Sequence, residues 1–221
     1  MSDKMKELVT VDEPRSPISE AFRTLRTNLD FAGLDRALKT LVVTSAGMGE
    51  GKSTTLANLA IVSAQAGRRV ILVDADLRRP MLHQVFGLDN SAGLTTMMMG
   101  AAALDSPPLR DTGVEGLSVL TSGPLPPNPA EVMGSRRMEE IIAALAGRAD
   151  QVLFDTPPVI AVTDAAVLAT KVDGVVLVIS AGHTRRDSAR TAVQRLQQIN
   201  ARIVGAVLTN VQVDASLKGY Y

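Results

Sequence analysis

The sequence predicts an α/β protein built on a doubly wound, mostly parallel sheet. Short apolar runs rich in Val, Ile and Leu recur along the chain, as expected of buried parallel strands. Stretches with helical spacing separate these runs, which indicates βαβ units with helices on both faces of the sheet. The 221 residues, 46% of them hydrophobic, suffice for one domain (residues 1–221) with a sizeable core and leave little room for a second.

The expected elements alternate regularly. The strands cover residues 41–44, 70–74, 117–120, 151–155, 175–180 and 204–209. The helices between them cover residues 52–66, 129–145, 163–170 and 185–198. Ligands of such sheets bind beyond the carboxyl ends of the strands, so the residues that follow each strand are the first candidates for a functional site.

One more helix is expected before the first strand, over residues 15–33, after a flexible polar segment at residues 1–14. Ser16 and Pro17 are a typical helix start, with serine as the N-cap and proline in the first turn. The apolar residues at positions 18, 22, 25 and 29 fall on one stripe, which should face the core.

Composition excludes several classes of protein. Equal numbers of basic and acidic residues, 23 each, argue against a nucleic-acid-binding protein. The absence of cysteine excludes disulfides, thiolate metal sites and a cysteine nucleophile. The first 13 residues lack the apolar core of a signal peptide, and the apolar run at 174–181 is far shorter than the roughly 20 residues of a membrane-spanning helix. We therefore expect a cytoplasmic protein that reaches a membrane only through a partner.

The two tyrosines of the chain are its last two residues, Tyr220 and Tyr221. Tyrosine normally packs half-buried with its hydroxyl at the surface, yet the predicted folded body contains none. Composition alone does not distinguish a chance tail from a functional one.

A Walker A loop, AGMGEGKS, begins at Ala46 and ends at Ser53. It follows a predicted strand and opens a predicted helix, which is the context that the motif requires. Lys52 would hold the β- and γ-phosphates of ATP, and the Ser53 hydroxyl would bind Mg²⁺. The expected nucleotide-binding residues here are Gly47, Met48, Gly49, Glu50, Gly51, Lys52, Ser53 and Thr54.

Acidic residues end two of the predicted strands. Asp74 and Asp76 stand at the end of one, separated by a single residue, and Asp155 ends another, as in a Walker B motif. Carboxylates at these positions suit Mg²⁺, which prefers hard oxygen ligands completed by phosphates and water. Aspartate at a strand end is also a common turn former, but beside a Walker A loop the metal-binding interpretation is favoured.

Taken together, these motifs resemble the bacterial tyrosine kinases of capsule and exopolysaccharide synthesis, which are P-loop proteins of the MinD/ParA-like class. The resemblance runs from about Glu13 to Tyr221. The segments that carry it, besides the Walker motifs, are residues 74–78, residues 123–131 with Ser135, residues 155–158, residues 163–165 and the pattern Glu20-x-x-Arg23-x-x-Arg26.

The resemblance implies roles for individual residues. Lys52, Asp74 and Asp76 would be catalytic, and Ser53, Asp76 and Asp155 would hold Mg²⁺. Asp74 would activate the acceptor hydroxyl, which is needed because free tyrosine has a pKa near 10. Asn210, after the last strand, would contact adenine as in related ATPases, although asparagine there is equally a strand terminator.

The resemblance also implies an assembly. Glu20, Arg23 and Arg26 would build a ring of subunits, and the tyrosines of the tail at residues 214–221 would be phosphorylated within it. The alternative for the helix is an exposed Glu–Arg pair of little energetic weight. Implied partners are a membrane-anchored activator or polysaccharide co-polymerase, protein tyrosine substrates and a cognate phosphatase.

Two departures and two alternatives remain open. Met48 stands where the family commonly has proline, and the tail holds two tyrosines where the family often has a longer cluster, so the tail is either short or truncated. One alternative is a MinD/ParA-like ATPase switch without kinase activity. Its signature lysine early in the P-loop is replaced here by Gly47, and no terminal amphipathic helix follows. The other is an assembly regulator in which ring formation matters more than chemistry.

Overall fold

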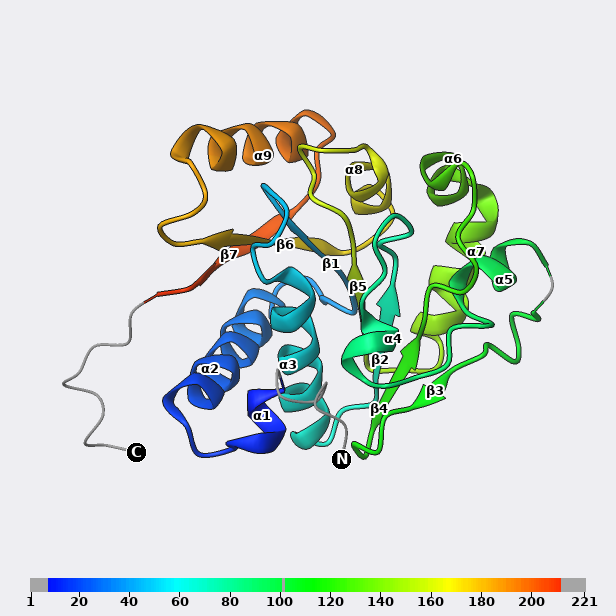
Figure 1. Ribbon diagram of the computed structural model, residues 1–221, viewed down its shortest axis with the longest axis horizontal. Helices are drawn as coiled ribbons and strands as arrows, with labels where there is room; N and C mark the ends of the chain where they lie inside the picture. Colours follow the sequence, from blue (N-terminus) through cyan, green and yellow to red (C-terminus); the bar gives the residue numbers. More distant parts are fainter. Residues whose placement is uncertain (1–7, 101, 212–221) are drawn as a thin grey trace.

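The computed structural model describes residues 8–100 and 102–211. Within them, a seven-stranded sheet has the order β3-β4-β2-β5-β1-β6-β7, with helices on both of its faces (Figure 1). Neighbouring strands are parallel except for the short edge pair β3–β4, which is antiparallel. The predicted doubly wound, mostly parallel sheet is confirmed.

The strand and helix bounds follow the expected alternation closely. The strands are β1 Thr40–Ser45, β2 Val70–Asp74, β3 Arg110–Asp111, β4 Leu117–Leu120, β5 Gln151–Asp155, β6 Gly174–Ser180 and β7 Ile203–Thr209. The helices are α1 Val9–Asp12, α2 Pro17–Ala32, α3 Lys52–Gln65, α4 Leu82–Val85, α5 Leu94–Met98, α6 Pro129–Gly134, α7 Arg136–Ala146, α8 Asp164–Ala169 and α9 Arg186–Gln198. The edge strand β3 and the short helices α1 and α4 were not predicted.

The core lies on both faces of the sheet because successive side chains of a strand point to opposite sides. On β1, Val42 joins a cluster with α7, α8 and α9, whereas Val43 joins a second cluster with α3. On β5, Phe154 and Leu153 divide in the same way. Strands buried on both faces need apolar residues at consecutive positions, which explains the continuous apolar runs in the sequence.

The predicted helix over residues 129–145 is wrong in one respect, because two helices occupy this region. Ser135 interrupts it with an extended backbone, φ −69° and ψ 155°. Its hydroxyl accepts a hydrogen bond from the backbone N–H of Met138 and caps α7. The N-cap stabilises a new helix start and a change of direction, and it outweighs continued helical spacing.

The expectation of a flexible segment over residues 1–14 is wrong for residues 8–14, while residues 1–7 lie outside the described residues. Leu8 is buried in the cluster beneath α3, and α1 follows it. The backbone N–H and the hydroxyl of Thr10 both donate to Asn58 Oδ1, at 3.1 and 2.8 Å. Packing and these two hydrogen bonds order a segment whose polar sequence gave little sign of structure.

Helix α2 begins as predicted, with Pro17 in its first turn and the Ser16 hydroxyl accepting from Ser19 N. Leu29 is buried and the middle of the stripe packs against the core, but Ile18 is 50% exposed. Ile18 lines an open groove beside β7 instead of facing the core, so the predicted stripe fails at its first position.

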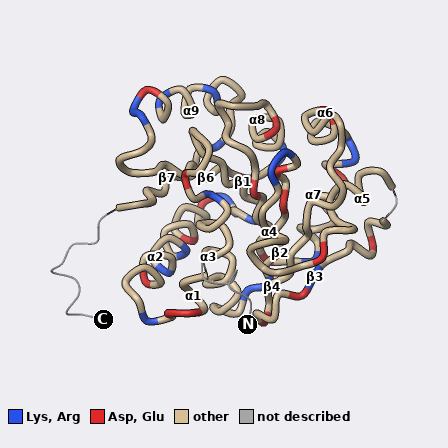
Figure 2. Tube along the Cα trace, viewed as in Figure 1, with Lys and Arg blue, Asp and Glu red and all other residues tan. Residues whose placement is uncertain are grey.

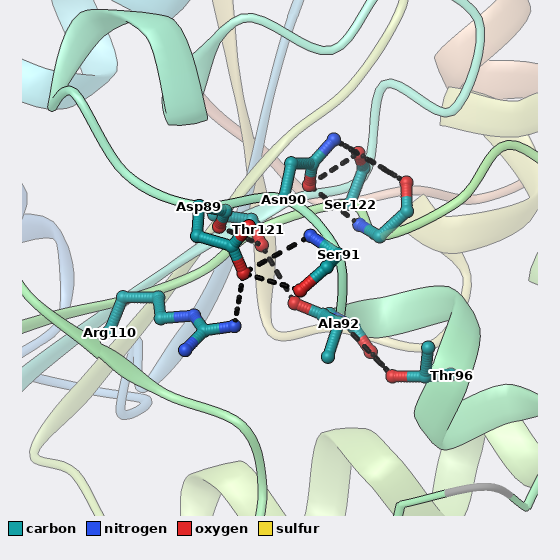
Figure 3. Close-up of polar contacts among 10 residues, drawn as sticks. Asp89, Asn90, Ser91, Ala92, Thr96, Arg110, Thr121 and Ser122 are labelled. Atoms are coloured by element: carbon teal, nitrogen blue, oxygen red, sulfur yellow. Dashed lines mark hydrogen bonds and ion pairs between the residues drawn. The ribbon is translucent and has the colours of Figure 1, made fainter.

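A network of polar contacts anchors the loop after α4 to the end of β4 (Figure 3). Asn90 Oδ1 accepts from the backbone N–H of Gly123 at 2.8 Å, and its amide donates to Ser122 Oγ at 3.1 Å. A Cβ atom on Gly93 would lie 2.1 Å from the carbonyl oxygen of Thr121, so only glycine allows this approach. The network fixes the start of the proline-rich loop over residues 123–129.

Figure 2 shows basic and acidic residues interspersed along the trace. This agrees with the zero net charge of the chain. Among the described residues, no helix is long and apolar enough to cross a bilayer.

Candidate active site

The loop between β1 and α3 has the backbone of a phosphate-binding loop. Gly49 and Gly51 have φ angles of +72° and +83°, in the left-handed region that favours glycine. Gly51 is the N-cap of α3, and Lys52 is the first residue of this 14-residue helix. A glycine-rich turn that leads into a helix N-terminus is a backbone arrangement suited to binding anions, so the predicted phosphate-binding residues lie in the expected structural context.

Glu50 braces this loop from within. Its side chain is buried, and its carboxylate accepts hydrogen bonds from the backbone N–H of Ala46 at 3.1 Å and from Thr184 Oγ1 at 2.7 Å. Its backbone oxygen accepts from Thr209 Oγ1 at 2.8 Å. Both oxygens of the Glu50 carboxylate are therefore engaged in hydrogen bonds within the protein. No motif pointed to Thr184, which lies after β6.

The predicted charged residues come together at the carboxyl ends of β1, β2 and β5. The Nζ of Lys52 lies 3.0 Å from Asp76 Oδ2 and 3.5 Å from Asp155 Oδ1. The Ser53 hydroxyl donates to Asp155 Oδ2. Asp74 is fully buried beside them, with the backbone N–H of Leu82 donating to its Oδ2 at 2.9 Å. We call Lys52, Asp74, Asp76 and Asp155 the charged cluster.

The charged cluster holds three carboxyl groups but only one cation. Burial lowers the pKa of Lys52, but the carboxylates of Asp155 and Asp76 outweigh this effect and raise the pKa above its ordinary value. Burial also raises the pKa of Asp155, against the opposing effects of Lys52 and Ser53. For Asp74, burial and then the charge of Asp155 raise the pKa to about 8. The cluster therefore favours a second cation.

The residues present fit a magnesium ion that also binds phosphates. Asp74 Oδ1 and Asp155 Oδ1 are buried and accept no hydrogen bond from any described residue, and the one charge that pairs with them is Lys52 Nζ, 3.5 Å from Asp155 Oδ1. Within residues 8–100 and 102–211, no group of three or more His, Cys, Asp or Glu side chains is arranged to hold a metal alone. Magnesium sites completed by substrate phosphates and water need no such group.

A cavity of about 440 Å³ opens onto the loop. Its remaining walls come from the segments after β2 and β5, and its lining includes Lys52, Ser53, Asp76, Arg78, Met81 and Pro157. Asn210 does not line this cavity. It lies on the other side of the loop, in a second groove that also includes Gly51 and Thr54, with its amide donating to Ser180 Oγ at 2.8 Å.

The predicted assembly residues lie on α2, away from the charged cluster. Arg23 pairs with Glu20 and donates to the carbonyl oxygen of Pro14 at 2.6 Å. Arg26 donates to the carbonyl oxygen of Val62 at 3.2 Å. Each side chain thus has a partner within its own chain. Tyr220 and Tyr221, the predicted acceptors, lie outside the described residues.

Comparison with known proteins decides the family. Residues 41–219 match the model of the CobQ/CobB/MinD/ParA nucleotide binding domain. The chain is 43% identical over 221 residues to tyrosine-protein kinase YwqD of Bacillus subtilis, across 100% of this chain and 93% of that protein. The chain belongs to the bacterial tyrosine-protein kinases.

Solved structures agree with this assignment. The kinase domain of the Escherichia coli tyrosine kinase ETK matches with a TM-score of 0.86 and 34% identity, over 94% of this chain and 82% of that one. The septum site-determining protein MinD of Pyrococcus horikoshii, complexed with Mg-ADP, matches with a TM-score of 0.66 and 25% identity, over 77% of this chain and 70% of that one. The bacterial tyrosine-protein kinases thus share the MinD fold, and relatives that match this chain over its full length are named as kinases.

Proposed function

We propose that this tyrosine kinase transfers the terminal phosphoryl group of ATP to Tyr220 and Tyr221 at its own C-terminus. The observation that carries the proposal is the charged cluster beside the phosphate-binding loop, in a chain whose two tyrosines both lie in the tail. In the reaction, the bond from the terminal phosphorus to the bridging oxygen of ADP breaks. A new bond forms to the phenol oxygen, and the phenol loses its proton.

The residues of the loop would position the nucleotide. Lys52, held protonated by its carboxylate neighbours, would bind the β- and γ-phosphates, and the loop amides would bind the remaining oxygens. Ser53, Asp76 and Asp155 would hold Mg²⁺, which when bound neutralises charge on the phosphates. Asn210 would lie at the adenine, since its groove shares Gly51 and Thr54 with the loop.

Asp74 would accept the phenol proton. Its Oδ1 accepts no hydrogen bond from the described residues, which leaves the atom open for this role. Because Asp74 is fully buried, the role requires the chain around Lys52 and Asp76 to rearrange when nucleotide and acceptor bind.

Transfer would take place between subunits of a ring. The tail at residues 214–221 spans at most about 25 Å when extended, so a neighbour's loop is easier to reach if subunits are held head to tail. Glu20, Arg23 and Arg26 would exchange some of their contacts within the chain for contacts with the neighbour.

The proposed partners and pathway rest on the family resemblance alone. A membrane-anchored activator would recruit the kinase to the inner face of the membrane, a cognate phosphatase would reverse phosphorylation, and capsular or exopolysaccharide synthesis would be regulated through protein tyrosine substrates.

A mixing experiment tests the acceptor and the route together. A Lys52→Met chain with an intact tail is incubated with Mg-ATP and an active chain in which Tyr220 and Tyr221 are both phenylalanine. We expect phosphotyrosine on the Lys52→Met chain, mapped to the tail by mass spectrometry. Phosphate on the double phenylalanine chain incubated alone would show Ser or Thr acceptors and contradict the proposal.

The same mixture tests the ring. If wild type alone gives phosphotyrosine and the mixture gives none, transfer occurs within one chain and the ring is wrong. Replacing Glu20, Arg23 and Arg26 by alanine should give monomers in light scattering and slow the transfer between chains. A substitution of Arg15, an exposed residue just before α2, is the matched control and should leave assembly unchanged.

A further inference from the structure

Two segments that the family resemblance singled out have no role in the mechanism so far. Arg78 follows Asp76 after β2, and Asp164 is the first residue of α8. They are 86 positions apart in the sequence, yet Arg78 Nε lies 3.0 Å from Asp164 Oδ2 in an ion pair. The fold therefore joins two separate sequence features at one point.

Arg78 is also connected to the charged cluster. Its backbone N–H donates to Asp76 Oδ1 at 3.3 Å, while the other oxygen of Asp76 contacts Lys52. Arg78 and Lys52 both line the cavity of about 440 Å³. Asp76 thus contacts the backbone of Arg78 with one carboxylate oxygen and the side chain of Lys52 with the other. Both basic residues line the same cavity.

The ion pair leaves part of the guanidinium free. Asp164 is 1% exposed and bonds Arg78 only at Nε, so the two terminal nitrogens of Arg78 have no acceptor among the described residues. The Arg78 side chain is 42% exposed, and the residue lines the cavity. Held at Nε, the planar guanidinium presents both terminal N–H₂ groups in a geometry that suits phosphate oxygens.

We infer that Arg78, oriented by Asp164, binds the terminal phosphate of ATP and makes the site distinguish ATP from ADP. The loop amides and Lys52 bind the phosphates from the side of the loop, whereas Arg78 comes from a different strand end and adds a second cationic contact to the terminal phosphate. Asp164 is a positioning residue, since it acts through Arg78. This inference rests on the proposed function, because it requires ATP to bind at the loop.

Calorimetry tests the inference without relying on kinase activity. The dissociation constants of the magnesium complexes of ADP and of the imido analogue of ATP, which is not hydrolysed, are measured for each variant. In Arg78→Met, binding of the ATP analogue should weaken about 10- to 100-fold, which is the effect of losing a charge-assisted hydrogen bond, and ADP binding should change less than about twofold. Asp164→Asn should show the same selective loss at roughly 3- to 10-fold, because a neutral amide orients Arg78 less firmly.

The chain provides matched controls at the other end of β2. Arg69 precedes this strand and pairs with Asp150, just as Arg78 follows it and pairs with Asp164. Arg69→Met and Asp150→Asn should leave both dissociation constants unchanged. If Asp164 merely stabilised α8, Asp164→Asn would lower the thermal midpoint and weaken both nucleotides equally, which would contradict a positioning role.

Two results for Arg78→Met would overturn the inference. One is unchanged discrimination between the two nucleotides, and the other is an equal loss for both. Unchanged discrimination together with a raised KM for a tail peptide would assign Arg78 to the acceptor. If wild type binds the ATP analogue normally, these results leave the proposed function intact. Failure of wild type to bind either nucleotide would remove the proposed function and the inference together.

Discussion

Strand β5 has an aspartate at each end, one exposed to solvent and the other buried. Asp150, just before the strand, is exposed, and the Arg69 guanidinium that hydrogen bonds to it lowers its pKa to about 2. Asp155, the last residue of the strand, is fully buried, and burial raises its pKa despite Lys52 and Ser53 nearby. The aspartate at one end of the strand is thus paired with an arginine at the surface, whereas the aspartate at the other end is buried among more carboxyl groups than cations.

The same contrast holds along the neighbouring strands. At the amino end of β1, Asp173 Oδ2 accepts three hydrogen bonds, from Lys39 N, Thr40 N and Thr40 Oγ1, at 2.8 to 3.0 Å. At the carboxyl end, the three carboxyl groups of the charged cluster share Lys52. Because these carboxylates at the amino ends of the strands are paired, incomplete pairing at the carboxyl ends is not imposed by the fold. The excess of buried carboxyl groups at the carboxyl end therefore supports the proposal that a metal and phosphates bind there.

The largest expected effect in this comparison comes from Asp155→Asn. Loss of the buried carboxylate should slow phosphotyrosine formation at least roughly 100-fold and raise the Mg²⁺ concentration needed for half-maximal rate. Rates measured across a magnesium series check this. An unchanged magnesium midpoint would show that Asp155 does not serve the metal.

Two substitutions distinguish the proposed role of Asp74 from that of Asp76. Asp74→Asn should leave Mg-ATP binding nearly unchanged but stop phosphoryl transfer, whereas Asp76→Asn should weaken the magnesium dependence. Calorimetry with Mg-ATP, alongside a kinase assay, distinguishes the two. Equal loss of nucleotide in both variants would contradict the division of roles.

Asp74 also affects stability in the metal-free protein. Its pKa is about 8 in the folded protein against an ordinary value of 3.8, so between these pH values the unfolded chain has lost a proton that the folded chain retains. Stability therefore falls as pH rises through this window. In the presence of a chelator at pH 8, Asp74→Asn should raise stability by about 1–3 kcal/mol, or roughly 2–10 °C in Tm. A lower Tm for the variant at this pH would mean that burial of the acid is not the dominant cost.

A smaller effect is expected at the brace of the loop. Thr184→Val removes a hydrogen bond to the buried Glu50 carboxylate, which should weaken ATP binding roughly 3- to 10-fold and lower stability by about 1–2 kcal/mol. Thr184→Ser keeps the hydroxyl and should restore both properties. Failure of serine to rescue would indicate that the threonine methyl group matters instead.

The smallest effect is expected at the amino end of β5. Asp150→Asn breaks an exposed ion pair with Arg69, and exposed pairs contribute little to stability. Both Tm and kinase rate should stay at their wild-type values. A loss of kinase activity comparable to that of Asp155→Asn would erase the distinction between the two ends of the sheet.

The sequence predicted the parts of the molecule whose determinants are local. The apolar runs place the central strands, and the Gly-Lys-Ser segment in its strand-loop-helix context places Lys52 and Ser53. The strand-end aspartates converge as expected, because parallel strands bring their carboxyl ends to one edge. The ordered segment around Leu8 and the break at Ser135 were missed, since one depends on Asn58 in α3 and the other on a single capping hydroxyl that competes with helical spacing.

Contacts between distant segments explain the rest. Nothing near Glu50 in the sequence indicates that Thr184 and Thr209 hold it, and Arg78 and Asp164 lie 86 positions apart. These pairings depend on how β2, β5, β6 and β7 are ordered in the sheet, which hydrophobic periodicity does not specify. The sequence therefore predicts which residues gather at the carboxyl ends of the strands better than it predicts which residues hold them in place.

Lys52→Met tests the central claim most directly. The matched control is Lys39→Met. Lys39 immediately precedes β1, whereas Lys52 follows β1 after the loop, so the control makes the same substitution at the opposite end of the strand. With Mg-ATP, we expect Lys52→Met to lose phosphotyrosine formation by about 1,000-fold or more while its circular dichroism stays that of wild type, and Lys39→Met to keep full activity. Phosphotyrosine at wild-type levels in a folded Lys52→Met protein would contradict the claim that the charged cluster and its loop carry out the transfer.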